Sequence, residues 1–247
     1  AEGDISITGT NIDLNSTTYT SNTGSLTFNG DVDLDGSGTT TVTASANSGT
    51  GNITFNDVVN DAGSNSPLIL NAPGTTTFGN SIGSTSALSS LTTDAAGTTA
   101  SAGATTVVTS GDQTYNDPVT LSASNDFNGN NITFNNTVDD SGGGTGDLTF
   151  TLNGGDATLN GAVGGNAPLN RVFDTTSAGT ININGGEVTT TGAQTYDTAV
   201  VLDADTTLTT TSGGNITFNN TLNSDDASTL RDLTVDGNNI IFNNAVG

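Results

Sequence analysis

The phrase Asn-Ile-Thr-Phe-Asn occurs three times in the chain, at residues 52–56, 131–135 and 215–219. Side chains alternate between the two faces of a β-strand, so Ile53 and Phe55 point to one side and Thr54 to the other. The three isoleucines, Ile53, Ile132 and Ile216, are spaced by 79 and 84 residues. A strand pattern that recurs over such an interval predicts stacked units that share one continuous core.

Other landmarks keep the same long register. Gln-Thr-Tyr stands at 113–115 and again at 194–196, 81 residues later, and Tyr19 is the expected counterpart in the first copy. A Val-x-Leu strand follows each tyrosine: Val32/Leu34, Val119/Leu121 and Val200/Leu202. The copies close on Ile82-Gly83, Val163-Gly164 and Val246-Gly247. The repeat is therefore about 81 residues long and is present almost three times, at approximately 3–82, 83–163 and 164–247, with the last copy incomplete.

Within each copy the apolar anchors recur at shorter intervals, such as the 23 residues from Phe55 to Phe78. One turn of a β-solenoid needs about 20–25 residues, with Gly, Asn, Asp and Ser at the corners. We therefore predict an all-β solenoid of about ten to twelve coils, forming one continuous domain over 1–247, without helix. The structural alternative is an antiparallel sandwich, which does not explain the long register. The side chains expected inside are Ile53, Phe55, Phe78, Leu121, Ile132, Phe134, Leu202, Ile216, Phe218 and Phe242.

Composition restricts the partners. Of 247 residues, 25 are acidic and two are basic, which gives a net charge of −23. Such a surface repels nucleic acid and anionic lipid, so we expect neither nucleic-acid binding nor membrane insertion. The chain has no cysteine and no histidine, which excludes disulfides and thiolate chemistry. No apolar run approaches the ~20 residues of a membrane span.

The sharpest local motif is Asp31-Val32-Asp33-Leu34-Asp35-Gly36. Alternate carboxylates resemble the opening of a calcium loop, because calcium prefers several oxygen ligands at 2.3–2.6 Å. The glutamate that would complete an EF-hand is replaced by Val42. Calcium at Asp31, Asp33 and Asp35 is therefore a hypothesis beside the simpler interpretation, a strand with its aspartates outward. We expect the chain to require no cofactor, and calcium is the one candidate ligand at these positions. We interpret Asp139/Asp140 and Asp225/Asp226 as solvated turns.

The sequence argues against two further functions, catalysis and ice binding. Catalysis would have to rely on aspartate alone, since His and Lys are missing and Arg171 and Arg231 have no counterpart in the other copies. We therefore expect no enzyme activity. The threonine runs at 39–41, 75–77, 189–191 and 209–211 suggest an ice-binding face, but their spacing is irregular. Threonine as an outward strand residue explains them better.

Gln-Thr-Tyr, Val-x-Leu, Gly-Asn-Ile-Thr-Phe-Asn and the closing Val-Gly together resemble the repeats of filamentous-haemagglutinin-like bacterial exoproteins of the two-partner-secretion and autotransporter type. The resemblance covers nearly the whole chain. It implies a right-handed parallel β-helix, export through an outer-membrane secretion barrel, and an extracellular or cell-surface location. It also implies a role as the shaft of an adhesin or fibre. No secretion domain, effector or anchor is visible, so the resemblance is to a shaft alone.

The sequence thus predicts a non-catalytic structural segment of a cell-surface adhesin or extracellular fibre. The alternatives are a module that binds a glycan or a host or environmental surface through its Asp/Thr-rich face, and a filament subunit. Neither end carries an evident cap, and uncapped rungs pair readily with other strand edges. The expected neighbours are therefore further repeats of a longer shaft or identical subunits stacked end to end.

Overall fold

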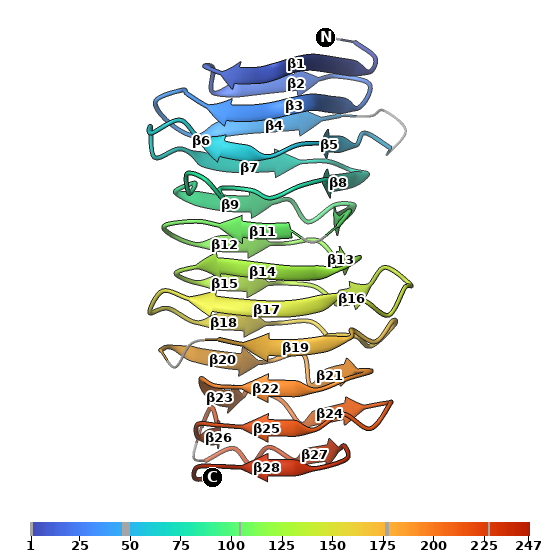
Figure 1. Cartoon of the computed structure of the whole chain (residues 1–247), viewed down its shortest axis with the longest axis vertical. Coiled ribbons are helices and arrows are strands. Elements are labelled where there is room, and N and C mark those ends of the chain that lie inside the picture. Colours follow the sequence, from blue (N-terminus) through green and yellow to red (C-terminus); the bar gives the residue numbers. More distant parts are fainter. Residues whose placement is uncertain (1, 46–49, 104, 176–177, 227) are drawn as a thin grey trace.

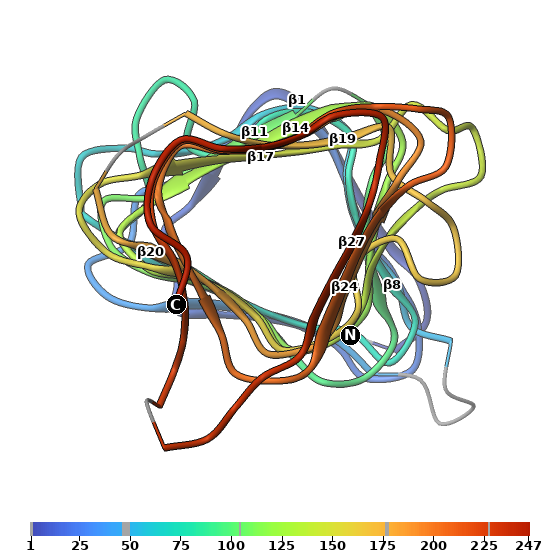
Figure 2. The ribbon, with the colours of Figure 1, turned by 90° about the horizontal axis from the view of Figure 1, so that it is seen from below.

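The computed structural model describes residues 2–45, 50–103, 105–175, 178–226 and 228–247. This part of the chain winds into a single solenoid of strands and turns (Figure 1). Every pair of neighbouring strands is parallel, which confirms the solenoid and rules out the sandwich. In Figure 2 the chain turns anticlockwise as it approaches the viewer, so the coil is right-handed. The described residues contain no helix, and therefore none that could cross a bilayer.

The cross-section has three faces, here called A, B and C in chain order (Figure 2). Face A contains the first halves of β1 (Ile5–Leu14) and β3 (Leu26–Leu34), then β5 (Ile53–Phe55), β8 (Thr75–Phe78), β10 (Thr98–Ser101), β13 (Val119–Leu121), β16 (Val138–Asp140), β21 (Glu187–Thr190), β24 (Thr206–Thr210) and β27 (Leu233–Asp236). Face B contains the second halves of β1 and β3, then β6 (Val59–Asp61), β11 (Thr105–Val108), β14 (Ser124–Gly129), β17 (Asp147–Leu152), β19 (Arg171–Asp174), β22 (Gln194–Tyr196), β25 (Ile216–Phe218) and β28 (Ile240–Phe242).

Face C is an unbroken ten-stranded sheet, so the coil makes about ten turns. Its strands are β2 (Thr18–Ser21), β4 (Thr40–Ala44), β7 (Pro67–Asn71), β9 (Ser90–Thr93), β12 (Gln113–Tyr115), β15 (Ile132–Phe134), β18 (Ala157–Leu159), β20 (Thr180–Ile183), β23 (Ala199–Leu202) and β26 (Leu222–Ser224).

The core is one column of apolar side chains inside the coil, supplied by alternate residues of most strands, whereas β10 turns Thr99 and Ser101 inward. Nine of the ten side chains expected inside are buried there. Phe242 is the exception, because 41% of its surface is exposed. Its ring stacks on Phe218 at 5.0 Å, but it belongs to β28, which among the described strands pairs with β25 alone. The expectation that Phe242 is buried was therefore wrong.

Stacked aromatic rings show which positions correspond between the copies. Tyr115 stacks on Phe134 at 4.8 Å and Tyr196 on Phe218 at 5.1 Å. The matching pair in the first copy is Phe28 on Phe55, at 4.9 Å. Phe28, and not Tyr19, is thus the counterpart of the two later tyrosines. Tyr19 is only partly buried, and its hydroxyl accepts a hydrogen bond from the N–H of Ser16.

The long repeat does not return to the same face of the solenoid. From β5 on face A the chain returns to that face at β8, β10 and β13, and then passes β14 before β15 on face C. From β15 it returns to face C at β18, β20 and β23, and then passes β24 before β25 on face B. Each copy therefore covers three and two-thirds turns. The phrase Asn-Ile-Thr-Phe-Asn accordingly lies on faces A, C and B in turn.

The closing glycine of each copy is required by its corner. Gly83 and Gly164 have φ values of +70° and +68°, which residues other than glycine rarely adopt. A Cβ at Gly83 would also lie 2.2 Å from the carbonyl oxygen of Val108 on the next rung. The N–H of Gly83 donates to the carbonyl of Val59, and that of Gly164 to the carbonyl of Val138. Adjacent rungs are thus joined where the chain bends most tightly.

Candidate functional sites

The asparagines of the repeated phrase join one rung to the next. Asn135 donates from Nδ2 to Oδ1 of Asn116 at 2.7 Å, and Asn160 donates to Asn135 at 2.7 Å. Asn184 continues this ladder by donating to Asn160 at 2.8 Å. Asn56, at the same place in the first phrase, donates to Asn29 at 2.6 Å. These exposed amides therefore join successive rungs at more than one corner of the coil.

Two corner aspartates are also structural. Asp140 is 5% exposed, and its carboxylate accepts hydrogen bonds from the N–H groups of Gly142, Gly144, Thr145 and Gly146. Burial alone raises the pKa of Asp140, but these donors outweigh it, so the pKa lies below its ordinary value. The carboxylate thus fixes the loop that follows its own strand, β16.

Asp61 holds its corner in the same way. It is 5% exposed and accepts from the N–H groups of Gly63, Asn65 and Ser66. Asp139 is buried as well and accepts from the N–H groups of Asn166 and Ala167. The expectation that Asp139 and Asp140 form a solvated turn was wrong, because residues 142–146 cover Asp140 and the segment at 166–167 covers Asp139. Asp225 and Asp226 do lie in an exposed turn.

The aspartates of the calcium hypothesis lie along β3 and just after it. Val32 and Leu34 are completely buried, and Asp31, Asp33 and Asp35 alternate with them on the outer side. Alternate residues of a strand are about 6.6 Å apart along the backbone, and Asp35 lies beyond the end of β3. Within the residues that the structure describes, no three acidic side chains are gathered so as to hold a metal. Calcium at these positions stays a prediction.

A second candidate is a patch on the outside of face B that we call the Phe173 patch: Asp126, Asp147, Thr149, Arg171 and Phe173. The strands place Asp126, Thr149 and Phe173 side by side on neighbouring rungs. The Phe173 ring is 41% exposed. Arg171 donates from Nη2 to Oδ2 of Asp147 at 2.7 Å, while its own side chain stays 56% exposed.

Thr149 separates two shallow hollows in this patch. One, of about 210 Å³, is lined by Asp147, Thr149, Arg171 and Phe173. The other, of similar volume, includes Asp126 and Thr149. Burial raises the pKa of the Asp126 carboxyl, although Thr151 donates a hydrogen bond to it at 3.0 Å. The patch therefore combines an exposed ring with several hydrogen-bonding groups.

Sequence reasoning noted Arg171 but missed Phe173. A signal was present, since the 81-residue register aligns Arg171-Val172-Phe173-Asp174 with Ser90-Leu91-Thr92-Thr93. The inward Val172 and Leu91 agree, whereas the outward Ser90 and Thr92 become arginine and phenylalanine. The fold does not require that change, because β9 forms the same kind of strand without it.

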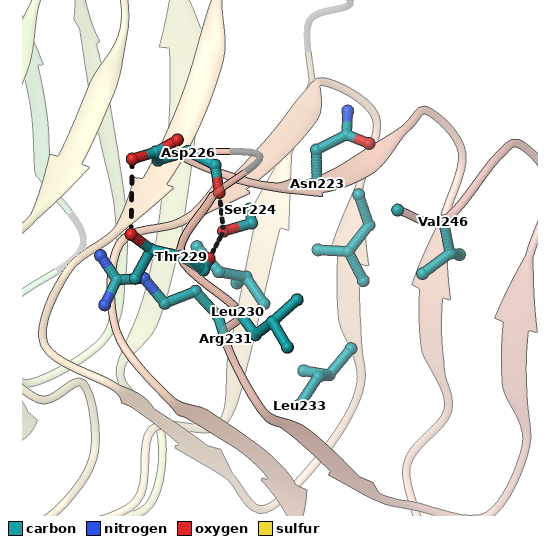
Figure 3. Close-up of a pocket in the computed structure, with 11 residues that line it drawn as sticks. Asn223, Ser224, Asp226, Thr229, Leu230, Arg231, Leu233 and Val246 are labelled. Atoms are coloured by element: carbon teal, nitrogen blue, oxygen red, sulfur yellow. Dashed lines mark hydrogen bonds between the residues drawn. The ribbon is translucent and has the colours of Figure 1, made fainter.

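The third candidate is a hollow of about 540 Å³ beside β26 and β27, which we call the end hollow (Figure 3). Its apolar lining comes from Leu202, Leu222, Leu230, Leu233 and Val246. Asn223, Ser224, Asp226, Thr229, Arg231 and Gly247 complete it. Leu230 is 90% exposed, so much of this lining is open to solvent.

Arg231 stands at the rim of the end hollow. It donates from Nε to Oδ1 of Asp225 at 3.0 Å and from Nη2 to Oδ1 of Asp203 at 3.3 Å. The hydrogen bond from Arg231 lowers the pKa of Asp225 to about 2. The charge of Arg231 is thus paired with two carboxylates at the rim.

Comparisons of the chain with protein-family models, with curated proteins and with solved structures found no match.

Proposed function

We propose that the chain is a non-catalytic shaft segment of a bacterial cell-surface adhesin or extracellular fibre. The observation that carries the proposal is the use made of the repeated polar residues. The asparagines of the phrase, Gln113 with Tyr115, and the carboxylates of Asp61 and Asp140 all bind neighbouring backbone or neighbouring rungs. Repeated polar groups that form hydrogen bonds within the coil are what an extended, rigid shaft requires.

The resemblance to filamentous-haemagglutinin-like exoproteins supports the remainder of the proposal. A shaft of this kind would leave the cell through an outer-membrane secretion barrel and act outside it. Its strongly acidic surface would keep neighbouring shafts apart through charge repulsion. At ~4.8 Å per rung, the segment described here would span roughly 50 Å of such a shaft.

A distance measurement tests the shaft role. Since the chain contains no cysteine, Asn22→Cys and Asp236→Cys place two spin labels at exposed positions near opposite ends without competing thiols. A rigid shaft gives one narrow distance distribution in pulsed electron resonance, unchanged by moderate salt. A broad distribution, or one that shifts with salt, would show a hinge and contradict the proposal.

The Phe173 patch favours a second candidate function, the binding of a neutral glycan. A sugar ring stacks on an exposed aromatic face, and its hydroxyls pair with carboxylates, threonines and free guanidinium donors. A neutral ligand fits better than an anionic one because the surface carries a net charge of −23. Each hollow, at about 210 Å³, has room for a single small ring.

A glycan array with the purified segment separates the two functions. The glycan function predicts saturable binding to one neutral sugar, which Phe173→Ala abolishes. Thr92→Ala, at the matching outward position of β9, is the control and should leave binding intact. Absence of saturable binding to any glycan would leave the shaft role alone, and binding that survives Phe173→Ala would exclude the patch as its site.

A further inference from the structure

The end hollow corresponds to a place that is filled twice elsewhere in the chain. Leu222, Leu233 and Val246, which line it, correspond to Val138, Leu148 and Val163 in the middle copy. In the first copy the same places are taken by Val59, Leu68 and Ile82. The contacts agree, because the N–H groups of Gly83, Gly164 and Gly247 donate to the carbonyls of Val59, Val138 and Leu222 respectively.

In the first two copies a short segment follows that glycine and covers the corner. It runs from Gly83 to Leu88 and from Gly164 to Leu169, and in each case four residues lie between the glycine and the leucine. Both leucines are completely buried and belong to the core. The carbonyl of Ser86 accepts from the N–H of Asp61, and the carbonyl of Ala167 accepts from the N–H of Asp140.

A side-chain acceptor fixes each covering segment. Oδ1 of Asn60 accepts from the N–H groups of Thr85 and Ser86, at 3.1 and 3.3 Å. Oδ1 of Asp139 accepts from Asn166 and Ala167, at 3.0 and 3.3 Å. The residue at this position beside the end hollow is Asn223, which lies at its edge (Figure 3).

We propose that the end hollow is a binding site for a segment of the pattern x-x-x-x-Leu joined to Gly247, whose leucine fills the apolar lining and whose backbone N–H groups bind Asn223. The two filled corners define this occupant, since both carry a glycine of positive φ, four residues and a buried leucine. Val246-Gly247 already presents the first part of that pattern, with Gly247 at φ +90°. The proposal is independent of the shaft role, because it concerns what completes a rung.

Extending the chain tests this proposal. Gly-Asn-Ala-Pro-Leu-Asn, copied from residues 165–170, is appended after Gly247, and the matched control carries Ser in place of that Leu. Amide hydrogen exchange is then followed in β26 and β27. We expect exchange there to slow by about 10-fold or more with leucine relative to serine, which corresponds to the burial of one leucine side chain.

Asn223→Ala supplies the second arm. It should remove a large part of the added protection in the leucine-extended chain and leave exchange in the unextended chain nearly unchanged. Equal exchange in the leucine and serine extensions would overturn the proposal. It would also be overturned if β26 and β27 of the unextended chain became protected as protein concentration rises, because a second copy would then be the occupant.

Discussion

The hydroxyl of Tyr115 donates a hydrogen bond to Oε1 of Gln113 at 3.0 Å, and both side chains are completely buried. The amide of Gln113 in turn donates from Nε2 to the carbonyls of Val107 at 3.0 Å and Asn128 at 2.9 Å. Asn128 lies on β14, which pairs with β11 on the neighbouring rung, so the glutamine ties two rungs together. The tyrosine fixes which way the amide points.

The same arrangement recurs on another face. Tyr196 donates to Gln194 at 3.0 Å, and Gln194 donates to the carbonyls of Val188 and Thr209 at 3.1 and 2.9 Å. In the first copy Leu26 and Phe28 take the two positions. The same two inward positions are therefore filled by a hydrogen-bonded Gln/Tyr pair in two copies and by an apolar Leu/Phe pair in the first.

We predict that Gln113→Leu and Tyr115→Phe, made separately, together lower the free energy of unfolding by more than the double variant does. Tyr115→Phe leaves Oε1 of Gln113 buried without its donor, which costs about 1–3 kcal/mol. The double variant, which restores the Leu26/Phe28 combination, should cost less than the sum of the two single changes. Urea unfolding of the four proteins measures the coupling.

Tyr19→Phe is the control for the loss of a tyrosine hydroxyl, because the hydrogen bond between the N–H of Ser16 and the Tyr19 hydroxyl is exposed to solvent. It should change stability by less than about 0.5 kcal/mol. Strict additivity of Gln113→Leu and Tyr115→Phe would show that the hydroxyl does not orient the amide.

A second prediction compares a phenylalanine inside the core column with one on the last strand of face B. Phe134→Ala should lower the free energy of unfolding by about 3–5 kcal/mol through the cavity that it leaves. Phe134 is 1% exposed and contacts the rings of Tyr115, Phe127 and Phe150. Phe242→Ala should cost less than half as much, since Phe242 is 41% exposed. Equal losses measured by urea unfolding would contradict this account of the core.

Much of the solenoid could be predicted from Ile53, Phe55 and their counterparts. Both the alternation within a strand and the 81-residue register can be seen directly in the sequence. The face on which each strand lies could not be predicted. Assigning Phe55, Phe134 and Phe218 to three different faces requires the number of turns in a repeat, and this depends on where Ile82 and Val163 form single bridges instead of strands. Tyr19 was matched to Tyr115 by residue type, whereas the packing matches Phe28.

The polar positions were harder to predict than the apolar ones. Asp140 and Asp226 are each the second of two adjacent aspartates followed by small residues, yet one is buried by its own loop and the other is exposed. Only the path of residues 141–146, whose N–H groups turn inward, separates the two cases. Phe173 stands at a position where the copies differ, so the residues that the copies share do not point to it.

The calcium hypothesis makes a third prediction. Binding at Asp31, Asp33 and Asp35 requires that millimolar calcium raise the unfolding temperature saturably, because a ligand that binds only the folded state stabilises it. Sodium chloride at equal ionic strength is the reference, since screening of the net charge also stabilises. Asp33→Asn should remove the calcium effect, and the exposed Asp57→Asn should not. An unfolding temperature that responds to neither calcium nor chelator would end the hypothesis.

The fourth prediction concerns acid. The pKa of Asp140 is lowered in the folded chain from an ordinary 3.8, despite burial, by its N–H donors. Such a group stabilises the fold fully above pH 3.8, and this contribution is lost as pH falls through the lower folded-state pKa. The pKa of Asp117 is raised, first by its burial, although Thr93 and Thr99 donate to it. Its contribution has the opposite sign, because it is present at low pH and is lost as pH rises from 3.8 through the folded-state pKa.

Asp140→Asn should therefore destabilise the protein most at neutral pH, and the difference from the parent should shrink below about pH 4 as the parent's carboxylate is protonated. Asp117→Asn should be tolerated best at neutral pH relative to the parent, because it removes a buried charge. Urea midpoints at pH 7, 4 and 2.5 measure both differences. Comparing variants at one pH cancels the general relief of charge repulsion on acidification, and Asp57→Asn reports the effect of losing one exposed charge. A difference for Asp140→Asn that stays constant from pH 7 to 2.5 would mean that its ionised carboxylate does not hold the loop.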